Sequence, residues 1–233
     1  MISIVMPAHN EEGYLEPAVR TVVDGLTARG DDFEVIVAQN GSADATSAEA
    51  ARLAAAYDRV KPVDLPDADY GRALREGFLR ARGDVVVNFD VDLVDLDFLD
   101  RALTVLSQSD AAVVVGSKRN PESEDNRGAA RRLVTATFAL VLRHGFSLRI
   151  SDTHGLKALR RAPLEPLVAE CRFGKDIFDT ELIIRAERAG LLVEEIPVAV
   201  TDTRPPRTPI ARRIPRTLAG LARLWLLLRH SDS

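Results

Sequence analysis

The chain has 233 residues, of which 46% are hydrophobic and 28% charged, and its formal net charge is −4. That length supports a substantial core, the composition is typical of a globular protein, and the negative net charge gives no general reason to expect a nucleic-acid partner. The single cysteine excludes an internal disulfide, and because neither a signal peptide nor a run of about 20 apolar residues is expected, we expect the chain to be cytoplasmic.

The first half of the chain is expected to alternate strands and helices. The expected elements are a strand at 2–6, a helix from Asn10 through Leu26, a strand at 33–38, a helix capped by Ser42 or Asp44 and running to about Tyr57, a strand at 60–63, a helix at 70–81, a strand at 85–89, a helix at 98–107 and a strand at 111–115. Apolar residues at helical spacing indicate the helices, and short apolar runs indicate the strands. Short connections between them predict right-handed crossovers and a mostly parallel sheet.

Polar segments follow three of the expected strands. They are Pro7–Asn10, Gln39–Ser42 and Asp90–Asp92. Because ligands of parallel sheets bind outside the carboxyl ends of the strands, we expect these three segments to converge on one site.

Asp90 and Asp92 follow the expected strand at 85–89, with one residue between them. In an extended strand, residues i and i+2 point to the same side, and two carboxylates so placed repel each other unless a cation lies between them. A hard divalent cation such as Mg²⁺ or Mn²⁺ suits one or two carboxylates together with the oxygens of a substrate diphosphate. The alternative is a solvated strand end, or a helix cap at Asp92.

The second half is expected to be less regular. We expect a polar loop at 118–132, an apolar helix at 133–142, a turn at 151–155, a helix at 176–189, a strand at 191–200 and a last helix from about Thr217 to Arg229. From Thr203 to Ser231 there are seven arginines and no acidic residue.

The last expected helix has one apolar stripe flanked by arginines. Leu218, Leu221, Trp225 and Leu228 recur at three- and four-residue intervals along it. Such a helix is typical of one that lies on an anionic membrane surface. The alternative is that the same stripe packs on the body of the domain.

The chain carries an ordered set of short motifs. They are Ile4–Glu12, Asn88–Asp92, Val115–Arg119, Ser151–Arg161, Phe178–Leu182 and Glu195–Val198. This set resembles the family 2 glycosyltransferases, and among them the dolichyl- or polyprenyl-phosphate mannose and glucose synthases. The resemblance implies an α/β fold of the GT-A type, with a Rossmann-like, mostly parallel central sheet and helices on both faces. It also implies a single domain over residues 1–233, with a nucleotide-sugar-binding half (1–117), an acceptor half (118–202) and a basic amphipathic tail (203–233).

For the sugar donor, the resemblance implies a nucleotide-diphosphate sugar that is GDP- or UDP-linked, with Mg²⁺ or Mn²⁺ bound by Asp90 and Asp92. The implied donor-binding residues are Pro7, Ala8, Asn10, Glu11, Gln39, Asn40, Ser42, Arg72 and Asp90. The family usually has two aspartates at the positions of Gln39 and Asn40, so the base stays open, because an amide accepts a hydrogen bond but brings no charge. Glu11 is alternatively a first-turn helix residue, and Arg72 is alternatively a surface arginine.

For the acceptor, the resemblance leaves two alternatives. Lys118, Arg131 and Thr135 match positions that bind acceptor phosphate in the lipid-phosphate branch, unless they form a solvated basic face. A hydroxyl acceptor would instead need a carboxylate base within hydrogen-bond reach. The candidates for that base are Asp152, Asp179 and Glu181, and Asp179 is alternatively a helix cap or a salt-bridge partner.

The function implied is that of a metal-dependent inverting glycosyltransferase that moves a hexose to a polyprenyl (dolichyl-type) phosphate, peripheral on the inner face of the cell membrane. The enzymatic alternative is transfer to a sugar or small-molecule hydroxyl in polysaccharide or glycoconjugate synthesis. A nucleotidyltransferase would need a glycine-rich triphosphate loop, which residues 7–13 do not supply. A sugar-nucleotide-binding module without activity would not need intact Asp90 and Asp92.

Overall fold

The structure is a computed structural model, and it describes every residue of the chain except 121, 126–128, 176, 201–209 and 232–233. The side chains of residues 124, 125, 129–135, 200, 210–214, 216, 230 and 231 are not described.

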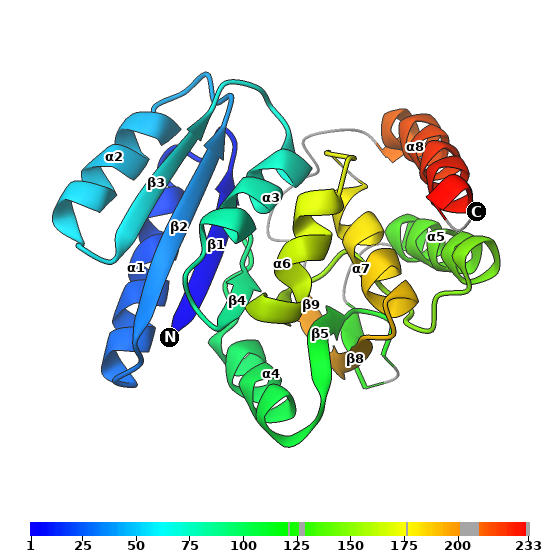
Figure 1. Cartoon of the computed structure of the whole chain (residues 1–233). Coiled ribbons are helices and arrows are strands. Elements are labelled where there is room, and N and C mark those ends of the chain that lie inside the picture. Colours follow the sequence, from blue (N-terminus) through cyan, green and yellow to red (C-terminus); the bar gives the residue numbers. More distant parts are fainter. Residues whose placement is uncertain (121, 126–128, 176, 201–209, 232–233) are drawn as a thin grey trace.

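In the described part of the chain, seven strands form one sheet in the order β3-β2-β1-β4-β7-β5-β8 (Figure 1). They are β1 (Ile2–Ala8), β2 (Phe33–Asn40), β3 (Val60–Leu65), β4 (Val85–Asn88), β5 (Ala111–Ser117), β7 (Lys157–Arg160) and β8 (Leu192–Pro197). β7 runs antiparallel to β4 and β5, and the other neighbouring pairs are parallel. The predicted α/β fold with a mostly parallel sheet is therefore confirmed.

Helices cover both faces of this sheet. One face carries α1 (Leu15–Ala28), α2 (Thr46–Ala56) and α4 (Leu96–Gln108), and the other carries α3 (Tyr70–Arg80), α6 (Arg161–Glu170) and α7 (Phe178–Arg188). α5 (Ala129–Phe146) and α8 (Ile210–Ser231) lie at the end of the molecule opposite β3 (Figure 1). In β1, Ile4 and Met6 pack on the α1 side and Val5 packs on the α3 side, which is why both alternating sets of its residues are apolar.

α1 begins at Leu15, later than the predicted start at Asn10. Asn10 and Gly13 have φ angles of 55° and 75°, in the left-handed region that a right-handed helix does not contain. The alternative role of Glu11 as a first-turn helix residue is therefore wrong, and Glu16 occupies the first turn instead.

The second half is more regular than predicted. Part of the predicted loop at 118–132 is ordered structure, because β6 (Glu124–Asp125) pairs with β9 (Ala199–Val200) and α5 begins at Ala129. The predicted strand at 191–200 is divided into β8 and β9. α6 was not predicted, since Pro163 and Pro166 lie within it, and proline usually marks the end or the first turn of a helix.

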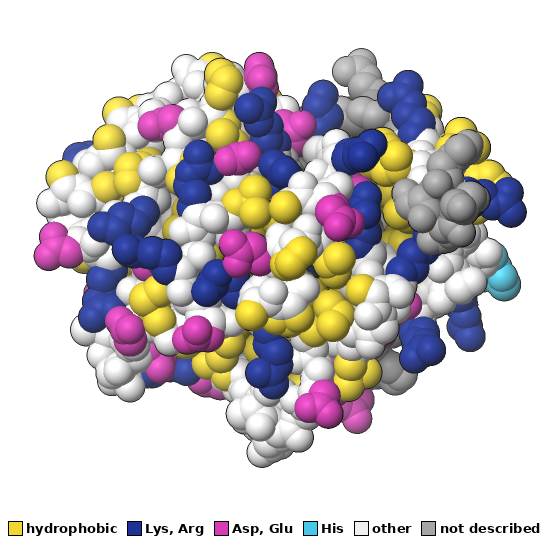
Figure 2. Space-filling model, viewed as in Figure 1, with side chains coloured by type: hydrophobic (Ala, Val, Ile, Leu, Met, Phe, Trp, Pro, Cys, Tyr) yellow, Lys and Arg dark blue, Asp and Glu magenta, His cyan; other side chains and the backbone are white. Residues whose placement is uncertain are grey.

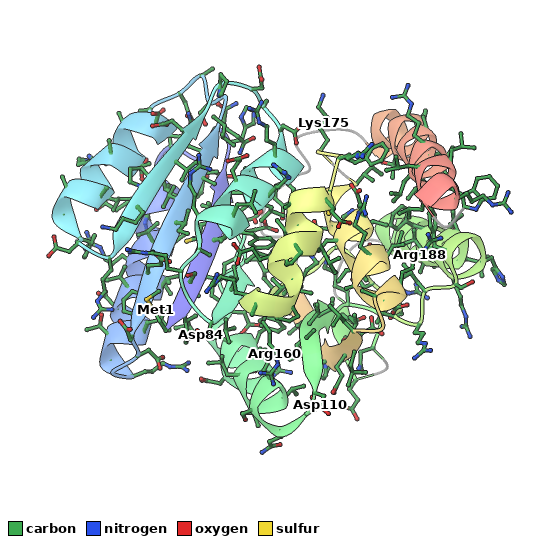
Figure 3. All side chains as sticks on the ribbon, viewed as in Figure 1. Met1, Asp84, Asp110, Arg160, Lys175 and Arg188 are labelled. Carbon is green, nitrogen blue, oxygen red and sulfur yellow. The ribbon has the colours of Figure 1, made fainter. Side chains whose placement is uncertain are left out.

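α8 begins at Ile210 and includes Pro215, so it is longer than the predicted helix at 217–229. It packs closely on the domain, because a Cβ atom added at Gly220 would lie 2.7 Å from Ile177 Cγ1. Arg188, at the end of α7, donates from Nη1 to the Leu228 carbonyl oxygen at 3.3 Å (Figure 3). Within the described residues, no helix is both long enough and apolar enough to cross a bilayer.

The packing of α8 corrects the predicted membrane-facing stripe. Leu221 and Leu228 of that stripe are buried in the core with Leu224. Leu218 is 49% exposed, and Leu226, which was not assigned to the stripe, is 53% exposed. The packing alternative is thus confirmed for Leu221 and Leu228, and a second, outer face of α8 is partly apolar.

Candidate active site

The carboxyl ends of β1, β2 and β4 meet at one edge of the sheet. β1 lies between β2 and β4 and is parallel to both. Beyond the strands, His9 Nδ1 lies 2.7 Å from the Asn40 carbonyl oxygen and joins the loops that follow β1 and β2. The convergence predicted from the three polar segments is confirmed by this strand order.

The loop after β1 holds most of the residues predicted to contact a nucleoside. Pro7 and Ala8 are the buried last residues of β1. Asn10 N donates to Ser42 Oγ at 3.1 Å, so two predicted donor-binding residues from different loops contact each other. Glu11 is only 9% exposed.

Gln39 and Asn40, which replace the usual aspartates, make hydrogen bonds within the protein. The Asn40 side chain donates from Nδ2 to the Ala8 carbonyl oxygen and accepts at Oδ1 from Asp69 N, both at 3.0 Å. Gln39 Oε1 accepts from Ser42 N at 3.0 Å. Asn40 therefore ties β1 to the start of α3, a role that the sequence did not reveal.

Asp90 and Asp92 lie in a turn rather than in an extended strand. β4 ends at Asn88, and Leu93 N donates to the Asp90 carbonyl oxygen at 2.9 Å to close the turn. Asp90 is half-buried and Asp92 is exposed. The alternation argument used to place both side chains on one side of a strand is therefore wrong, although both residues do lie at the carboxyl end of β4.

Asp90 lies among other charged groups. Burial raises the pKa of Asp90 above its usual value, and the nearby carboxylates of Asp92 and Asp179 add to this rise. The hydrogen bond from Tyr70 and the charge of Lys118 oppose it. The carboxyl end of β4 is thus a cluster of like charges that a cation would stabilise.

The chemistry of this cluster fits a divalent cation shared with a ligand. No group of three or more His, Cys, Asp and Glu side chains placed to hold a metal occurs among the described residues. Asp90 and Asp92 would therefore hold a cation only with the help of ligand oxygens. That arrangement is usual for Mg²⁺, which keeps one or two carboxylates and binds substrate phosphates.

Tyr70 contacts this cluster and was not predicted to. Its hydroxyl donates to Asp90 Oδ1 at 2.8 Å, and its side chain is 36% exposed. Burial raises the pKa of Tyr70 well above its usual value, and the neighbouring carboxylates of Asp90 and Asp179 add to this rise. Tyr70 therefore stays a hydrogen-bond donor to Asp90 at neutral pH.

The start of α3 is held close to the segment before α7. Asp69 caps α3 by accepting from Arg72 N at 2.9 Å and also accepts from Lys175 N at 2.6 Å. A Cβ atom added at Gly71 would lie 2.7 Å from both the Gly174 carbonyl carbon and Phe178 Cβ. Glycine is thus required at position 71 because the two segments touch through their backbones.

Arg72, in the same turn of α3, is largely exposed. Its side chain is 49% exposed and pairs with Asp67, with Arg72 Nη1 3.4 Å from Asp67 Oδ2. A phosphate-binding role for Arg72 remains a prediction.

Lys118 follows β5 and lies beside the 151–155 turn. Its backbone N donates to Asp152 Oδ2 at 3.4 Å, and its Nζ donates to the His154 carbonyl oxygen. Asp152 Oδ1 also accepts from His154 N at 2.9 Å. Glu195 of β8 orients this turn by accepting from Asp152 N at 3.0 Å. Arg131 and Thr135 lie in α5, and their side chains are outside the described residues.

Asp179 and Glu181 lie in the first turn of α7 and are both buried. The buried Lys157 side chain forms an ion pair with Asp179, with Nζ 2.8 Å from Oδ1, although Asp179 Oδ1 has no partner with hydrogen-bond geometry among the described residues. Glu181 Oε2 accepts from Arg172 N and Phe173 N at 3.0 and 2.9 Å, and its Oε1 accepts from Arg185 Nε at 3.0 Å. The salt-bridge alternative for Asp179 is confirmed. Lys157, a lysine next to the apolar residues Leu156, Ala158 and Leu159, is the signal that could have identified this pair.

A groove of about 770 Å³ lies elsewhere, between the starts of α1 and α2. It is lined by Glu12, Gly13, Glu16, Pro17, Arg20, Ala45, Ala48, Glu49 and Arg52. Because neither Asp90 nor Asp92 lines it, this groove is distinct from the carboxylate cluster.

Two curated proteins are similar to this chain along most of its length. Glycosyltransferase AglD of Haloferax volcanii is 32% identical over 229 residues, which cover 96% of this chain and 37% of that protein. The dolichyl-phosphate beta-glucosyltransferase of Drosophila melanogaster is 29% identical over 224 residues, which cover 86% of this chain and 67% of that protein. The chain thus spans about a third to two thirds of the length of these relatives.

A solved structure has the same fold. Glucosyl-3-phosphoglycerate synthase from Mycobacterium tuberculosis, in complex with Mn²⁺, uridine-diphosphate-glucose and phosphoglyceric acid, superposes with a TM-score of 0.71 at 23% identity, covering 97% of this chain and 79% of that one. Residues 3–167 of the chain match the family model described as glycosyl transferase family 2. Since this match covers well over half of the 233 residues, the chain belongs to glycosyl transferase family 2.

Proposed function

We propose that the chain is a metal-dependent inverting glycosyltransferase that transfers a hexose from a UDP- or GDP-linked sugar to a polyprenyl phosphate. One of its relatives is a dolichyl-phosphate beta-glucosyltransferase, which supports a polyprenyl phosphate as the acceptor. The solved structure with the same fold was determined with Mn²⁺ and a UDP-sugar, which supports the choice of donor and cofactor.

One observation supports a phosphate acceptor over a hydroxyl acceptor: each of the three candidate base carboxylates already has partners within the protein. Asp152 accepts from two backbone amides, Asp179 pairs with Lys157, and Glu181 accepts from three donors. A hydroxyl acceptor needs a base that can take its proton, whereas a phosphate monoester has already lost its first proton and, with a second pKa of about 6, most of its second proton at pH 7. Because all three carboxylates already form hydrogen bonds or an ion pair within the protein, a phosphate acceptor, which needs no base, is favoured over a hydroxyl acceptor.

The roles proposed for the residues follow from their positions. Asp90 and Asp92 would hold Mg²⁺ or Mn²⁺ together with the donor diphosphate, and the bound cation would neutralise charge that develops on the leaving group. Tyr70 orients Asp90 through its hydroxyl. Lys118 lies close enough to Asp90 for its positive charge to act on that carboxylate. We propose that its ammonium group attracts the anionic acceptor.

In the proposed reaction, an acceptor phosphate oxygen forms a bond to the anomeric carbon of the sugar. The bond from that carbon to the donor diphosphate breaks, and the nucleoside diphosphate leaves with the electron pair. One displacement inverts the configuration at this carbon, and no proton has to be removed from the acceptor. Arg131 and Thr135 are proposed to hold the acceptor phosphate.

We also propose that α8 lies against the anionic membrane surface that contains such an acceptor. Its outer face combines the exposed leucines Leu218 and Leu226 with Arg223 and Arg229, which are exposed as well. Figure 2 shows lysines and arginines beside apolar side chains at the end of the molecule where α8 lies. Each basic group near an anionic surface contributes about 1 kcal/mol of binding.

The test is a donor screen with and without acceptor. The purified chain is incubated with UDP- and GDP-sugars and with Mg²⁺ or Mn²⁺, and the release of nucleoside diphosphate is measured together with the lipid-linked product. Release that depends on polyprenyl phosphate supports the proposal. Release that depends only on a hydroxyl acceptor, or activity that is unchanged in excess EDTA, contradicts it.

A further inference from the structure

The loop after β1 is hydrogen-bonded, amide by amide, to side chains of the segment before and within α2. We call residues 9–16, which include the first two residues of α1, the donor loop, and residues 42–49 the clamp segment. The bonds are Asn10 N to Ser42 Oγ (3.1 Å), Glu11 N to Thr46 Oγ1 (2.7 Å), Glu12 N to Asp44 Oδ2 (3.1 Å), and Gly13 N and Glu16 N to the two oxygens of Glu49 (3.0 and 2.7 Å). Two bonds run the other way, from Ala43 N to Asn10 Oδ1 (2.8 Å) and from Ala45 N to Glu12 Oε2 (3.3 Å).

These bonds hold the donor loop outside helical geometry. Asn10 and Gly13 have positive φ angles, which glycine adopts freely and asparagine tolerates better than most residues. The acidic residues after Asn10 would otherwise favour the start of a helix. The first N–H groups of a helix have no partners within the helix. Here, side-chain oxygens of the clamp segment accept hydrogen bonds from these groups.

Thr46 and Glu49 are the buried members of the clamp segment. Thr46 is 0% exposed and Glu49 is 5% exposed. The Thr46 hydroxyl accepts from Glu11 N and donates to Asp44 Oδ1 at 2.5 Å. Glu49 replaces an N-terminal cap for α1, whose own cap residue Tyr14 makes no side-chain capping bond. Neither residue belongs to the predicted donor-binding set.

We propose that Thr46 and Glu49 are positioning residues for the nucleotide, because they hold the donor loop in the conformation that binds the nucleoside. This inference rests on the proposed function, since it assumes that Asn10 and Glu11 contact the donor. A site held rigid before binding loses less entropy when the ligand binds. Loosening the clamp should therefore weaken nucleotide affinity and leave the chemical step largely unchanged.

The test uses near-isosteric substitutions. Thr46→Val removes the hydroxyl that accepts from Glu11 N. Glu49→Gln replaces one carboxylate oxygen with an NH₂ group, so either Gly13 N or Glu16 N loses its acceptor. For each variant we expect the dissociation constant for UDP or GDP, measured by calorimetry, to rise about tenfold, a change equivalent to about 1.4 kcal/mol. The kcat at saturating donor should stay within about twofold, and Thr46→Ser, which keeps the hydroxyl, should restore affinity.

Matched controls and a milder variant keep the test decisive. Thr21→Val and Glu165→Gln make the same changes at exposed helix positions and should leave affinity unchanged. Asp44→Asn disturbs the clamp at a half-buried position, so it gives the same readout if the buried variants do not fold. Hydrogen exchange of residues 10–16 should be faster in the clamp variants only.

The outcomes separate this inference from the proposed function. If the unaltered chain binds neither UDP nor GDP, the proposed function is contradicted. If the unaltered chain binds one of them and the folded clamp variants bind it equally well, only the positioning role is wrong. A fall in kcat without a change in affinity would also overturn the positioning role.

Discussion

At the scale of single residues, Asp90 and Asp92 differ in their surroundings. Asp90 is half-buried and bonded to Tyr70, whereas Asp92 is exposed. If both hold the cation, each carboxylate would help to keep in place the positive charge that stabilises the departing diphosphate. Because Asp92 is exposed, replacing it should disturb the fold little.

We therefore expect Asp90→Asn and Asp92→Asn each to lower kcat at least about 100-fold, the effect of removing one group that stabilises the transition state. Initial rates at saturating donor and metal measure this. Asp97→Asn, on the exposed surface of α4, is the control and should keep full activity. A loss confined to the Asp90 variant would show that Asp92 does not bind the cation.

The buried pair of Lys157 and Asp179 leads to a prediction about stability. The two side chains are 1% and 5% exposed, so removing the lysine leaves a buried carboxylate without its partner. We expect Lys157→Met to lower the free energy of unfolding by about 3–5 kcal/mol. Urea denaturation measures this change. The double variant Lys157→Met with Asp179→Leu should be more stable than the single variant, and equal or lower stability of the double variant would contradict this account.

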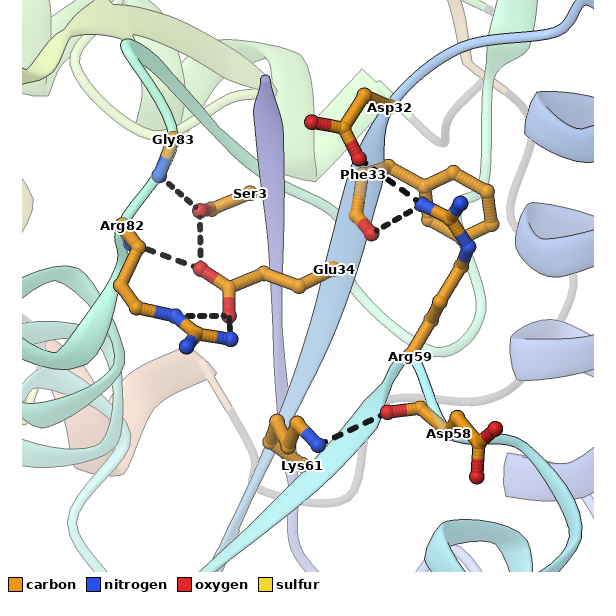
Figure 4. Close-up of polar contacts among 9 residues, drawn as sticks. All are labelled: Ser3, Asp32, Phe33, Glu34, Asp58, Arg59, Lys61, Arg82 and Gly83. Atoms are coloured by element: carbon orange, nitrogen blue, oxygen red, sulfur yellow. Dashed lines mark hydrogen bonds and ion pairs between the residues drawn. The ribbon is translucent and has the colours of Figure 1, made fainter.

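At the scale of elements, a polar network ties β1 and β2 to the turn before β4. Glu34 Oε1 accepts from Ser3 Oγ and Arg82 N, both at 2.7 Å, and its Oε2 accepts from Arg82 Nη2 at 3.1 Å (Figure 4). Ser3 Oγ in turn accepts from Gly83 N at 2.8 Å. Ser3 and Glu34 are paired across the two parallel strands. The network therefore holds the β1–β2 pair in place against β4 at the amino ends of the strands.

The charge of Glu34 makes this network sensitive to pH. Burial by itself raises the pKa of Glu34, but the hydrogen bonds from Ser3 and Arg82 and the Arg82 charge outweigh it, so the folded-state pKa is lowered. A lowered pKa in the folded state contributes stability above the unfolded-state pKa of about 4.3. That contribution is lost as the pH falls through the folded-state pKa.

We expect Glu34→Gln to lower the free energy of unfolding by about 1–3 kcal/mol at pH 7. The difference from the unaltered chain should narrow as the pH falls below about 4.3. Urea denaturation at several pH values measures both quantities. Glu165→Gln, at an exposed helix position, should change little at any pH, and a difference for Glu34→Gln that stays constant with pH would show that its charge is not involved.

At the scale of the whole molecule, α8 presents two apolar faces. Leu221, Leu224 and Leu228 pack on the domain, and Leu218 and Leu226 lie outside. The guanidinium of the exposed Arg229 lies 3.9 Å from the ring centre of the half-buried Trp225, so the two side chains form a cation–π contact.

We expect the chain to sediment with anionic vesicles and not with neutral ones, and salt should weaken this binding. Changing Leu218 and Leu226 together to serine should lower vesicle binding, because it removes apolar area from the outer face. Leu192→Ser, a change at another exposed leucine, is the matched control. Equal binding by all variants would place the membrane contact, if there is one, away from α8.

The two predicted halves are not separate in the sheet. β7, from the predicted acceptor half, lies between β4 and β5 of the predicted donor half and is antiparallel to both. The division at residue 117 remains a proposal about function. The carboxylate cluster combines both parts, because Asp179 acts on Asp90.

The sequence by itself determined the alternation of strands and helices in the first half and the place of Asp90 and Asp92 at the end of β4. These features depend on short-range patterns, namely apolar periodicity and the polar residues that end each strand. The apolar residues that repeat along α1 and the apolar run in β4 are examples.

Only the tertiary structure decided where α1 begins, which face of α8 is buried, and which carboxylates are engaged. The amides of residues 10–13 bond to side chains more than 30 positions away, and Asp179 forms an ion pair with a lysine of a different element. Such contacts leave no periodic pattern along the chain, because each joins residues that are distant in sequence. The sequence therefore indicated which residues lie at the site, and the packing of the folded chain determined which partner each of them has.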